Sequence, residues 1–343
     1  MKSEGDSIFI HALRSFFVSL FGVAGGLLGV VVIIALFFGI FSSASSDKHL
    51  SSKAKVIPNA LGIRSPFSPS TPVILHIPID GTIGLGEITA RKINDVLIGS
   101  REGALKNDLV KGIILTIDSP GGCANDSYLI YQQLREYKKR YDVPIYAYAN
   151  GLCASGGYYI ACAADQIFAS TVSLVGSVGV LGWPPSVNVA SALEKLGITT
   201  RTFSAGQNKD ELNPFRPWHE KEGAQRQYLI DFYYQNFVNV VRENRPKLSE
   251  ELLVDKYGAG LFPAYQAAEY GYIDHVDADL SMVIAAMAKE AGIEEHYQVV
   301  QFETEGWFKQ AFGNSVFLSG KIKHELVTPH SGTIDYLYTP STY

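Results

Sequence analysis

One serine lies in a stretch whose residue types suit nucleophilic catalysis. Ser155 belongs to the sequence N-G-L-C-A-S-G-G-Y-Y-I-A-C-A-A at 150–164, after an apolar run at 143–149 and before a helix-compatible stretch at 158–164. A hydroxyl at a strand-to-helix turn stands clear of the sheet, and the first N–H groups of the helix have no partners within it. Such a site suits attack on a carbonyl and stabilisation of the resulting oxyanion. The same residues also suit a serine that only caps a helix beside glycines that a tight turn requires.

The cysteines offer a second candidate nucleophile. There are three, Cys123, Cys153 and Cys162, too few for a disulfide framework and not spaced as a metal site. Cys153 is close to Ser155, but no histidine lies nearby in the sequence to activate it. We therefore expect the cysteines to be small core residues, and we expect neither a metal nor a cofactor.

Short apolar strands alternate with helices around this stretch. Strands are predicted at 73–79, 112–118 and 143–149, and helices at 89–107, 126–138, 222–244 and 279–291. This alternation predicts an α/β domain with a mostly parallel sheet. His76, inside the first strand, is predicted to be structural. Between 118 and 126, Gly121 and Gly122 form a turn whose N–H groups can approach a ligand closely, although an ordinary strand-to-helix turn would look the same.

A long apolar segment precedes the α/β part. Residues 15–41 carry no charge and exceed the roughly 20 residues that span a bilayer, so they predict a transmembrane anchor after a short N-terminal segment, 1–14. Lysine and arginine occur on both sides of the anchor and do not fix its orientation. The Ser- and Pro-rich stretch 42–72 is predicted to be a tether. The net charge of −5 argues against nucleic-acid binding.

Three motifs in one order resemble a known family. They are D-S-P-G-G at 118–122, A-S-G-G-Y-Y-I-A at 154–161 and V-G-S-V-G-V at 175–180. The chain resembles the bacterial signal peptide peptidase A (protease IV) family, of the Clp protease and crotonase superfamily, over 73–277. The resemblance implies a protease domain at 73–290 that is a spiral of repeated β-β-α units. A C-terminal extension and tail, 291–343, would follow it.

The resemblance also implies a Ser–Lys dyad. No histidine lies between His76 and His219, so a Clp-like Ser–His–Asp arrangement is not supported. The sequence S-A-G-Q-N-K-D at 204–210 places Lys209 at the lysine of the family, although the aromatic residue that often precedes it is missing. Without the resemblance, Lys209 would be interpreted as a solvated loop lysine. A lysine acts as a general base only when its pKa falls toward neutrality, and an exposed lysine stays charged.

The remaining roles are implied in the same way. Ser155 would be the nucleophile, Ser177 would orient Lys209, and the N–H groups of Gly122 and Gly156 would hold the oxyanion. Asp118 and Asp210 are better interpreted as turn and strand-end residues than as catalysts.

One protease repeat is visible, as in short family members that form rings and complete the dyad between neighbouring protomers. The resemblance thus implies a membrane-anchored serine endopeptidase that degrades cleaved signal peptides and other short apolar peptides through an acyl-enzyme. Its single-pass anchor would contact lipid in the bacterial cytoplasmic membrane, with the catalytic domain on the extracytoplasmic side. Two alternatives remain: a crotonase-like acyl-CoA enzyme, and a catalytically silent membrane scaffold.

Overall fold

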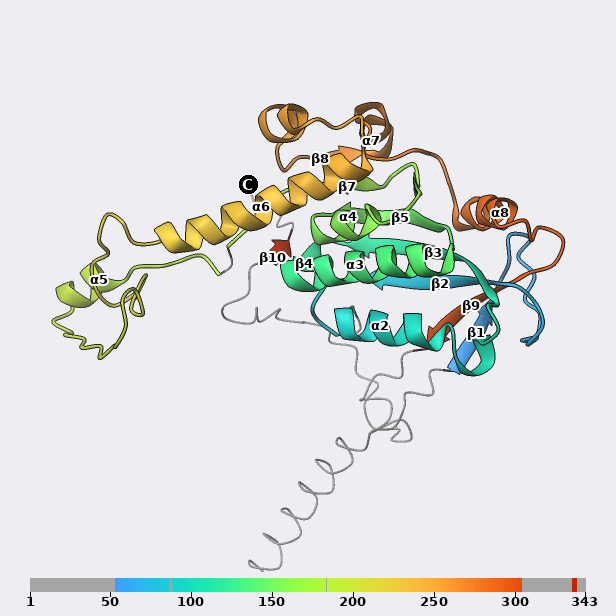
Figure 1. The fold of residues 1–343 in the computed structure, drawn as a ribbon. Helices are drawn as coiled ribbons and strands as arrows, with labels where there is room; N and C mark the ends of the chain where they lie inside the picture. Colours follow the sequence, from blue (N-terminus) through green and yellow to red (C-terminus); the bar gives the residue numbers. More distant parts are fainter. Residues whose placement is uncertain (1–52, 87, 183, 304–334, 338–343) are drawn as a thin grey trace, which may run out of the picture. The chain divides into compact units, whose positions relative to one another are not determined.

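A computed structural model describes residues 53–86, 88–182, 184–303 and 335–337 (Figure 1). The chain divides into two units, Met1–Ser51 and Ser52–Tyr343, and the fold below is that of the second. The predicted anchor, 15–41, lies outside the described residues. Within the described ranges, no helix has both the length and the apolar character needed to cross a membrane.

An eight-stranded sheet forms the centre of the second unit, in the order β1-β9-β2-β3-β5-β7-β8, with β6 paired to β5. The strands are β1 (Lys53–Ile57), β2 (Val73–Asp80), β3 (Val110–Ser119), β5 (Ile145–Ala154), β6 (Gln166–Ala169), β7 (Leu174–Gly176), β8 (Leu261–Pro263) and β9 (Gln298–Glu303). Pairing is parallel except where β1 joins β9 and β8 joins β7. Strands β2 and β3 are almost continuously buried, as expected for parallel strands covered on both faces. The predicted α/β class is confirmed.

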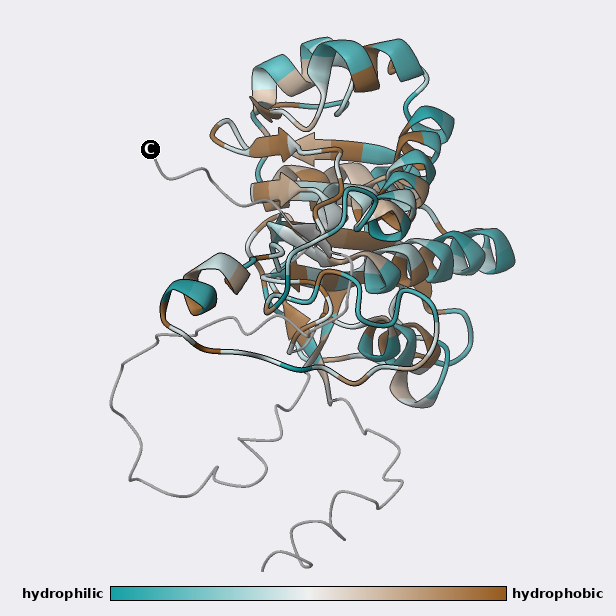
Figure 2. Ribbon diagram, turned by 90° about the vertical axis from the view of Figure 1, so that its left-hand side faces the viewer, coloured by the Kyte–Doolittle hydropathy of each residue, from teal (hydrophilic) through white to brown (hydrophobic). Residues whose placement is uncertain are grey.

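Helices cover both faces of the sheet (Figure 1). The described α-helices are α2 (Ala90–Gly99), α3 (Ala124–Tyr141), α4 (Gly156–Ala161), α5 (Ala190–Lys195), α6 (Ala224–Asn244), α7 (Ala264–Tyr270) and α8 (Leu280–Glu290). Of these, α5 has no buried residue and lies apart from the sheet. The larger core cluster joins α2, α3, α4 and α6 to one face, while a smaller cluster joins α8 to Ile74 and Ile114 on the other. Figure 2 shows the consequence: the strands are largely hydrophobic, whereas the helices carry hydrophilic residues on their outer sides.

Two of these strands lie in segments that flank the predicted domain. Strand β1 falls within 42–72 and β9 within 291–343, and the two pair from Lys53 opposite Glu303 to Ile57 opposite Val299. The sheet therefore extends into both flanking segments.

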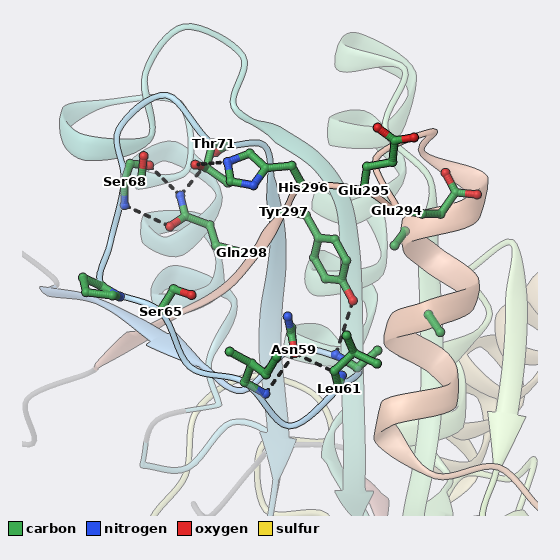
Figure 3. Close-up of a pocket in the computed structure, with 15 residues that line it drawn as sticks. Asn59, Leu61, Ser65, Ser68, Thr71, Glu294, Glu295, His296, Tyr297 and Gln298 are labelled. Atoms are coloured by element: carbon green, nitrogen blue, oxygen red, sulfur yellow. Dashed lines mark hydrogen bonds between the residues drawn. The ribbon is translucent and has the colours of Figure 1, made fainter.

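The loop that follows β1 is fastened to the residues before β9 (Figure 3). The buried Gln298 side chain accepts a hydrogen bond from Ser68 N at 3.1 Å and donates to Ser68 O at 2.7 Å. Thr71 Oγ1 lies 3.1 Å from His296 Nε2, and Tyr297 Oη accepts from Ala60 N at 3.3 Å. A cavity of about 530 Å³ lies between the two segments. These hydrogen bonds hold the loop after β1 against the segment before β9.

A long stretch between β7 and α6 is built differently from the rest. We call residues 184–223 the arm; it contains the short helix α5 (Figure 1). No residue of the described stretch 184–223 is buried. The arm then leads into α6, which is anchored in the core by buried residues, namely Phe237, Val238, Val240 and Val241.

Candidate active site

Ser155 occupies a sharp turn between β5 and α4. Strand β5 ends at Ala154 and α4 begins at Gly156, and Ser155 has φ +53° and ψ −119°. Positive φ is uncommon for a residue with a side chain. The conformation is held from both sides, because Ser155 N donates to Gly176 O at 2.9 Å and Ser155 O accepts from Tyr159 N at 2.9 Å. This is the geometry of a strand-to-helix turn that presents a nucleophile.

The hydroxyl of Ser155 is buried and unpaired. The residue is 1% exposed, and within the described part of the chain its Oγ has no hydrogen-bond partner. Its side chain also makes no capping bond to α4, so the helix-cap interpretation does not account for it. A buried hydroxyl without a partner costs free energy and calls for an explanation. Backbone strain and an unpaired polar atom at one residue indicate a functional site.

Gly122 and Gly156 lie on two elements that pack together. Gly122 belongs to β4 (Gly121–Cys123), which contacts α4, and Gly156 is the first residue of α4. Gly122 has φ +150°, and a Cβ there would lie 2.1 Å from Ile83 O, so only glycine fits. The N–H of Gly156 has no acceptor within the helix because it lies in the first turn. Both predicted oxyanion donors therefore lie in elements that pack against each other.

Strand β4 also pairs with a distant segment. Strand β10 (Asp335–Leu337) runs antiparallel to it, with Tyr336 opposite Gly122. An extended chain thus lies along the strand that carries the predicted oxyanion donor.

Ser177 is brought next to Ser155 by strand pairing. Strands β5 and β7 are parallel, with Ala154 opposite Gly176, and the Gly176 carbonyl is the acceptor for Ser155 N. Ser177 follows directly; it is buried, has φ +54° and donates its N–H to Gly260 O at 2.7 Å. The two predicted serines therefore share one end of the sheet.

Lys209 lies elsewhere. It is exposed on the arm, and its N–H donates to Gly206 O at 3.3 Å. A cavity of about 530 Å³ beside it is lined by residues of the arm and the start of α6, among them Asp210, Arg216 and Glu222. Ser155 does not line this cavity. A single chain thus brings Ser155, Ser177, Gly122 and Gly156 together without Lys209.

The cysteine alternative is weakened by burial. Cys153 and Cys162 are buried in the core, which confirms that prediction for both. Burial raises the pKa of Cys153 far above that of a free thiol and raises the pKa of Cys162 to about 12. A thiol held neutral is a poor nucleophile, because the thiolate is the reactive form. Cys123 is half-buried, and burial raises its pKa as well.

Other polar residues considered in the sequence make structural hydrogen bonds. His76 lies between Gln301 and Thr116, at 3.1 and 2.7 Å, and burial lowers its pKa, as predicted for a structural histidine. Asp118 Oδ1 accepts from Leu152 N at 2.9 Å and so braces β5 just before Ser155. Asp210 is hydrogen-bonded within the arm. No group of three or more His, Cys, Asp or Glu side chains in the described ranges is placed to hold a metal.

An α/β protein with a strained, buried serine at a strand-to-helix turn has the framework of a hydrolase. Comparison with known proteins agrees. The model for "Peptidase family S49" matches residues 137–294, a stretch that contains Ser155, Ser177 and Lys209. The chain is 30% identical over 263 residues to a putative signal peptide peptidase SppA of Enterococcus faecium, covering 74% of this chain and 75% of that protein. The chain belongs to peptidase family S49, the signal peptide peptidase A family, and it is a serine peptidase.

Two further similarities are more distant or shorter. A putative protease of Methanocaldococcus jannaschii is 34% identical over 174 residues, which cover 51% of this chain and 54% of that protein. The ClpP1 N165D mutant from Listeria monocytogenes is 16% identical, with a TM-score of 0.39 over 62% of this chain and 94% of the other. The spiral of β-β-α units stays a prediction.

Proposed function

We propose that the protein is a membrane-anchored endopeptidase with a Ser155–Lys209 dyad that two copies of the chain complete together. Lys209 of one copy removes the proton from Ser155 Oγ of another as the oxygen attacks the peptide carbonyl. The leaving amine takes the proton, an acyl-enzyme remains on Ser155, and water then releases the acid with Lys209 again acting as the base. The N–H groups of Gly122 and Gly156 hold the oxyanion, and Ser177 orients the lysine amine.

The observation that carries this proposal is the separation of the two partners. Ser155 Oγ is buried without a hydrogen-bond partner in the described part of its own chain, whereas Lys209 is exposed on the arm. A general base must come within hydrogen-bond reach of the proton that it removes. A neighbouring copy can supply such a lysine.

The surface of the arm supports assembly. Several of its large apolar side chains are exposed, which is unfavourable in water and typical of an interaction surface. They are Val187, Leu196, Ile198, Phe203 and Phe215. Burial of these side chains against another copy would bring the arm, and Lys209 with it, to a neighbouring domain.

The substrate class follows from β4 and from the family. Because β10 pairs with β4, this strand is able to bind an extended chain through its main chain, as peptide-binding proteins do at sheet edges. We therefore infer extended peptides as substrates. With the sequence-predicted anchor at 15–41 and the family relationship, this points to cleaved signal peptides and other short apolar peptides. The site of action would be the extracytoplasmic side of a bacterial cytoplasmic membrane.

Active-site labelling tests the dyad. The full-length protein in detergent is treated with a fluorophosphonate, and hydrolysis of an apolar peptide is followed on the same samples. Ser155→Ala is expected to abolish labelling and hydrolysis, and Lys209→Ala to lower both by about 10²–10⁴-fold. Lys195→Ala, which removes another exposed lysine of the arm, should have no effect.

Three results would contradict the proposal in different ways. Labelling that survives Ser155→Ala would reject the nucleophile. Full activity of Lys209→Ala would reject the base. An intact, assembled wild type that neither labels nor cleaves would instead indicate a scaffold, and thioester hydrolysis in place of peptide hydrolysis would indicate a crotonase-like enzyme.

A further inference from the structure

The loop that carries Lys209 has no hydrophobic anchor. Residues 206–213 form a series of turns in which no side chain is buried, and the N–H of Lys209 makes a weak bond of 3.3 Å to Gly206 O. A general base must nevertheless be held precisely, since a displacement of 1 Å can lower the rate about 10²-fold. Polar contacts must therefore position this loop.

Arg216 holds the residue next to Lys209. Its Nε donates to Asp210 Oδ2 at 2.7 Å, and its Nη2 donates to the main-chain carbonyl of Asp210 at 2.6 Å. Asn213 Nδ2 donates to the other carboxylate oxygen of Asp210 at 2.7 Å. Asp210, the residue directly after Lys209, is thus held through both its main-chain carbonyl and its side chain.

The same guanidinium connects the loop to α6. Arg216 Nη1 donates to Glu222, which lies just before the helix, and Glu222 Oε2 in turn accepts from Leu212 N at 3.2 Å. A second link joins Gly223 N to Glu211 Oε1 at 2.8 Å. Because α6 is anchored in the core, these bonds transmit the position of the helix to residues 210–213.

The geometry requires arginine. All three nitrogens of the guanidinium are used, and they donate to four separate acceptor groups, namely the carboxylate and carbonyl of Asp210, the carboxylate of Glu222 and the carbonyl of Pro217. A lysine at this position has a single nitrogen at the end of a flexible chain and cannot reproduce this planar arrangement.

We propose that Arg216 is a positioning residue for the peptidase reaction: it fixes the main chain at Asp210 and couples it to α6, which holds Lys209 where it can reach Ser155 of a neighbouring copy. This inference rests on the proposed function of Lys209 as the base. If Arg216 were an ordinary exposed ion-pair residue, its removal would change little.

The test measures kcat and KM for an apolar peptide, and the rate of fluorophosphonate labelling, on the full-length protein in detergent. Arg216→Gln is expected to lower kcat by about 10²-fold with KM nearly unchanged. Arg216→Lys should not restore the rate, for the geometric reason above. Arg242→Gln is the matched control, because Arg242 is an exposed arginine outside the arm that forms an ion pair with Glu250 at 2.6 Å. It should stay within about twofold of the wild type, as exposed charges usually do.

A double variant separates positioning from a general structural effect. In the Lys209→Ala background, Arg216→Gln should leave the residual labelling rate unchanged, since the group that it positions is already absent. A structural role would lower that residual rate too, and would shift the unfolding temperature or the mass of the assembly. Glu222→Gln, a milder change in the same network, should lower kcat in the same direction by a smaller factor.

Two results distinguish a failure of this inference from a failure of the proposed Ser155–Lys209 dyad. If Lys209→Ala is inactive while Arg216→Gln and Glu222→Gln keep the wild-type kcat, Arg216 does not position the base and only this inference fails. If Lys209→Ala keeps full activity, the dyad itself is rejected and both fall.

Discussion

At Ser155, the proposed nucleophile, the requirements of catalysis would oppose those of stability. A positive φ at a residue with a side chain costs about 1–2 kcal/mol, and a buried unpaired hydroxyl costs about 1–3 kcal/mol. The backbone bonds to Gly176 and Tyr159 hold the residue in place despite both costs. The turn thus leaves the hydroxyl without a partner in the described part of the chain.

This conflict predicts that inactive variants at residue 155 are more stable than the wild type. Ser155→Ala removes the unpaired hydroxyl and should raise the free energy of unfolding by about 1 kcal/mol. Ser155→Gly also relieves the backbone strain; the flexibility of glycine in the unfolded chain offsets about 0.5–1 kcal/mol of that gain, so it should be at least as stable as Ser155→Ala. Denaturant unfolding at one fixed protein concentration measures both.

The control for this prediction is Ser173, a buried and fully paired serine directly before β7. Ser173 Oγ donates to Ala149 O at 2.8 Å and accepts from Gly151 N at 3.1 Å. Ser173→Ala should therefore lower the free energy of unfolding by about 1 kcal/mol or more. A loss of stability in Ser155→Ala comparable to that of Ser173→Ala would show that the Ser155 hydroxyl is paired in solution.

At the scale of elements, apolar runs in the sequence predict the strands and helices that burial stabilises. Strands β2, β3 and β5, and the helices α3, α6 and α8, lie where the sequence predicts them, because each is stabilised by a continuous or periodic apolar face. The helix predicted at 89–107 ends earlier, at Gly99, and is followed by a separate 3₁₀ turn (Gly103–Leu105). Because parallel strands end at one edge of the sheet, the alternation also accounts for the meeting of Ser155 and Ser177.

Other elements leave no local signal. Strand β1 has the sequence K-A-K-V-I. Its ordering depends on pairing with β9, which lies far from β1 in the sequence. The arm has no apolar period, because its shape depends on hydrogen bonds such as those of Arg216 rather than on buried side chains. The sequence therefore predicts that Lys209 has a role only through family resemblance, and it does not point to Arg216 at all.

An ion pair between the buried Arg245 and the partly exposed Asp274 makes stability depend on pH. Arg245, at the end of α6, donates two hydrogen bonds to the Asp274 carboxylate at 2.8 and 2.9 Å and a third to Gly271 O at 3.0 Å. Asp274 also accepts from Ile167 N of β6 at 2.8 Å. Burial acts to raise the pKa of Asp274, but the hydrogen bonds from Arg245 and Ile167 outweigh it and lower the pKa below its ordinary value.

Asp274→Asn should therefore destabilise the protein near neutral pH. We expect a loss of about 2 kcal/mol, below the range for fully buried pairs because Asp274 is partly exposed. A lowered pKa stabilises the folded state fully above the unfolded value of about 3.9, and this contribution is lost as the pH falls through the lower folded value. The difference between variant and wild type should thus shrink below about pH 4.

Thermal or denaturant unfolding across this pH range measures the effect. Asp108→Asn serves as the matched control, because Asp108 forms an ion pair with Arg101 at 3.1 Å but is 78% exposed. It should change stability little at any pH. A constant deficit of Asp274→Asn down to pH 2 would show that the pair contributes through packing rather than through charge.

At the scale of the whole molecule, the proposed Ser155–Lys209 dyad requires more than one chain. The second unit contains the proposed nucleophile, the proposed oxyanion donors and the strand β4, while the proposed base lies on an exposed arm that carries several exposed apolar side chains. If arms dock on neighbours, each site contains Ser155 from one copy and Lys209 from the next. Two variants that are each inactive then carry complementary halves of the site.

Co-expression of Ser155→Ala with Lys209→Ala should therefore restore activity. With equal amounts and random assembly, a site is complete when its own chain keeps Ser155 and the neighbouring chain keeps Lys209, so about a quarter of the sites should function in a head-to-tail assembly. Peptide hydrolysis by the purified mixed assembly measures this. Ser155→Ala co-expressed with a chain that carries both substitutions is the control, and it should stay inactive because no chain keeps the nucleophile. If the mixed assembly is no more active than the Lys209→Ala assembly alone, the dyad forms within one chain, and the arm must then fold back onto its own domain rather than reach a neighbour.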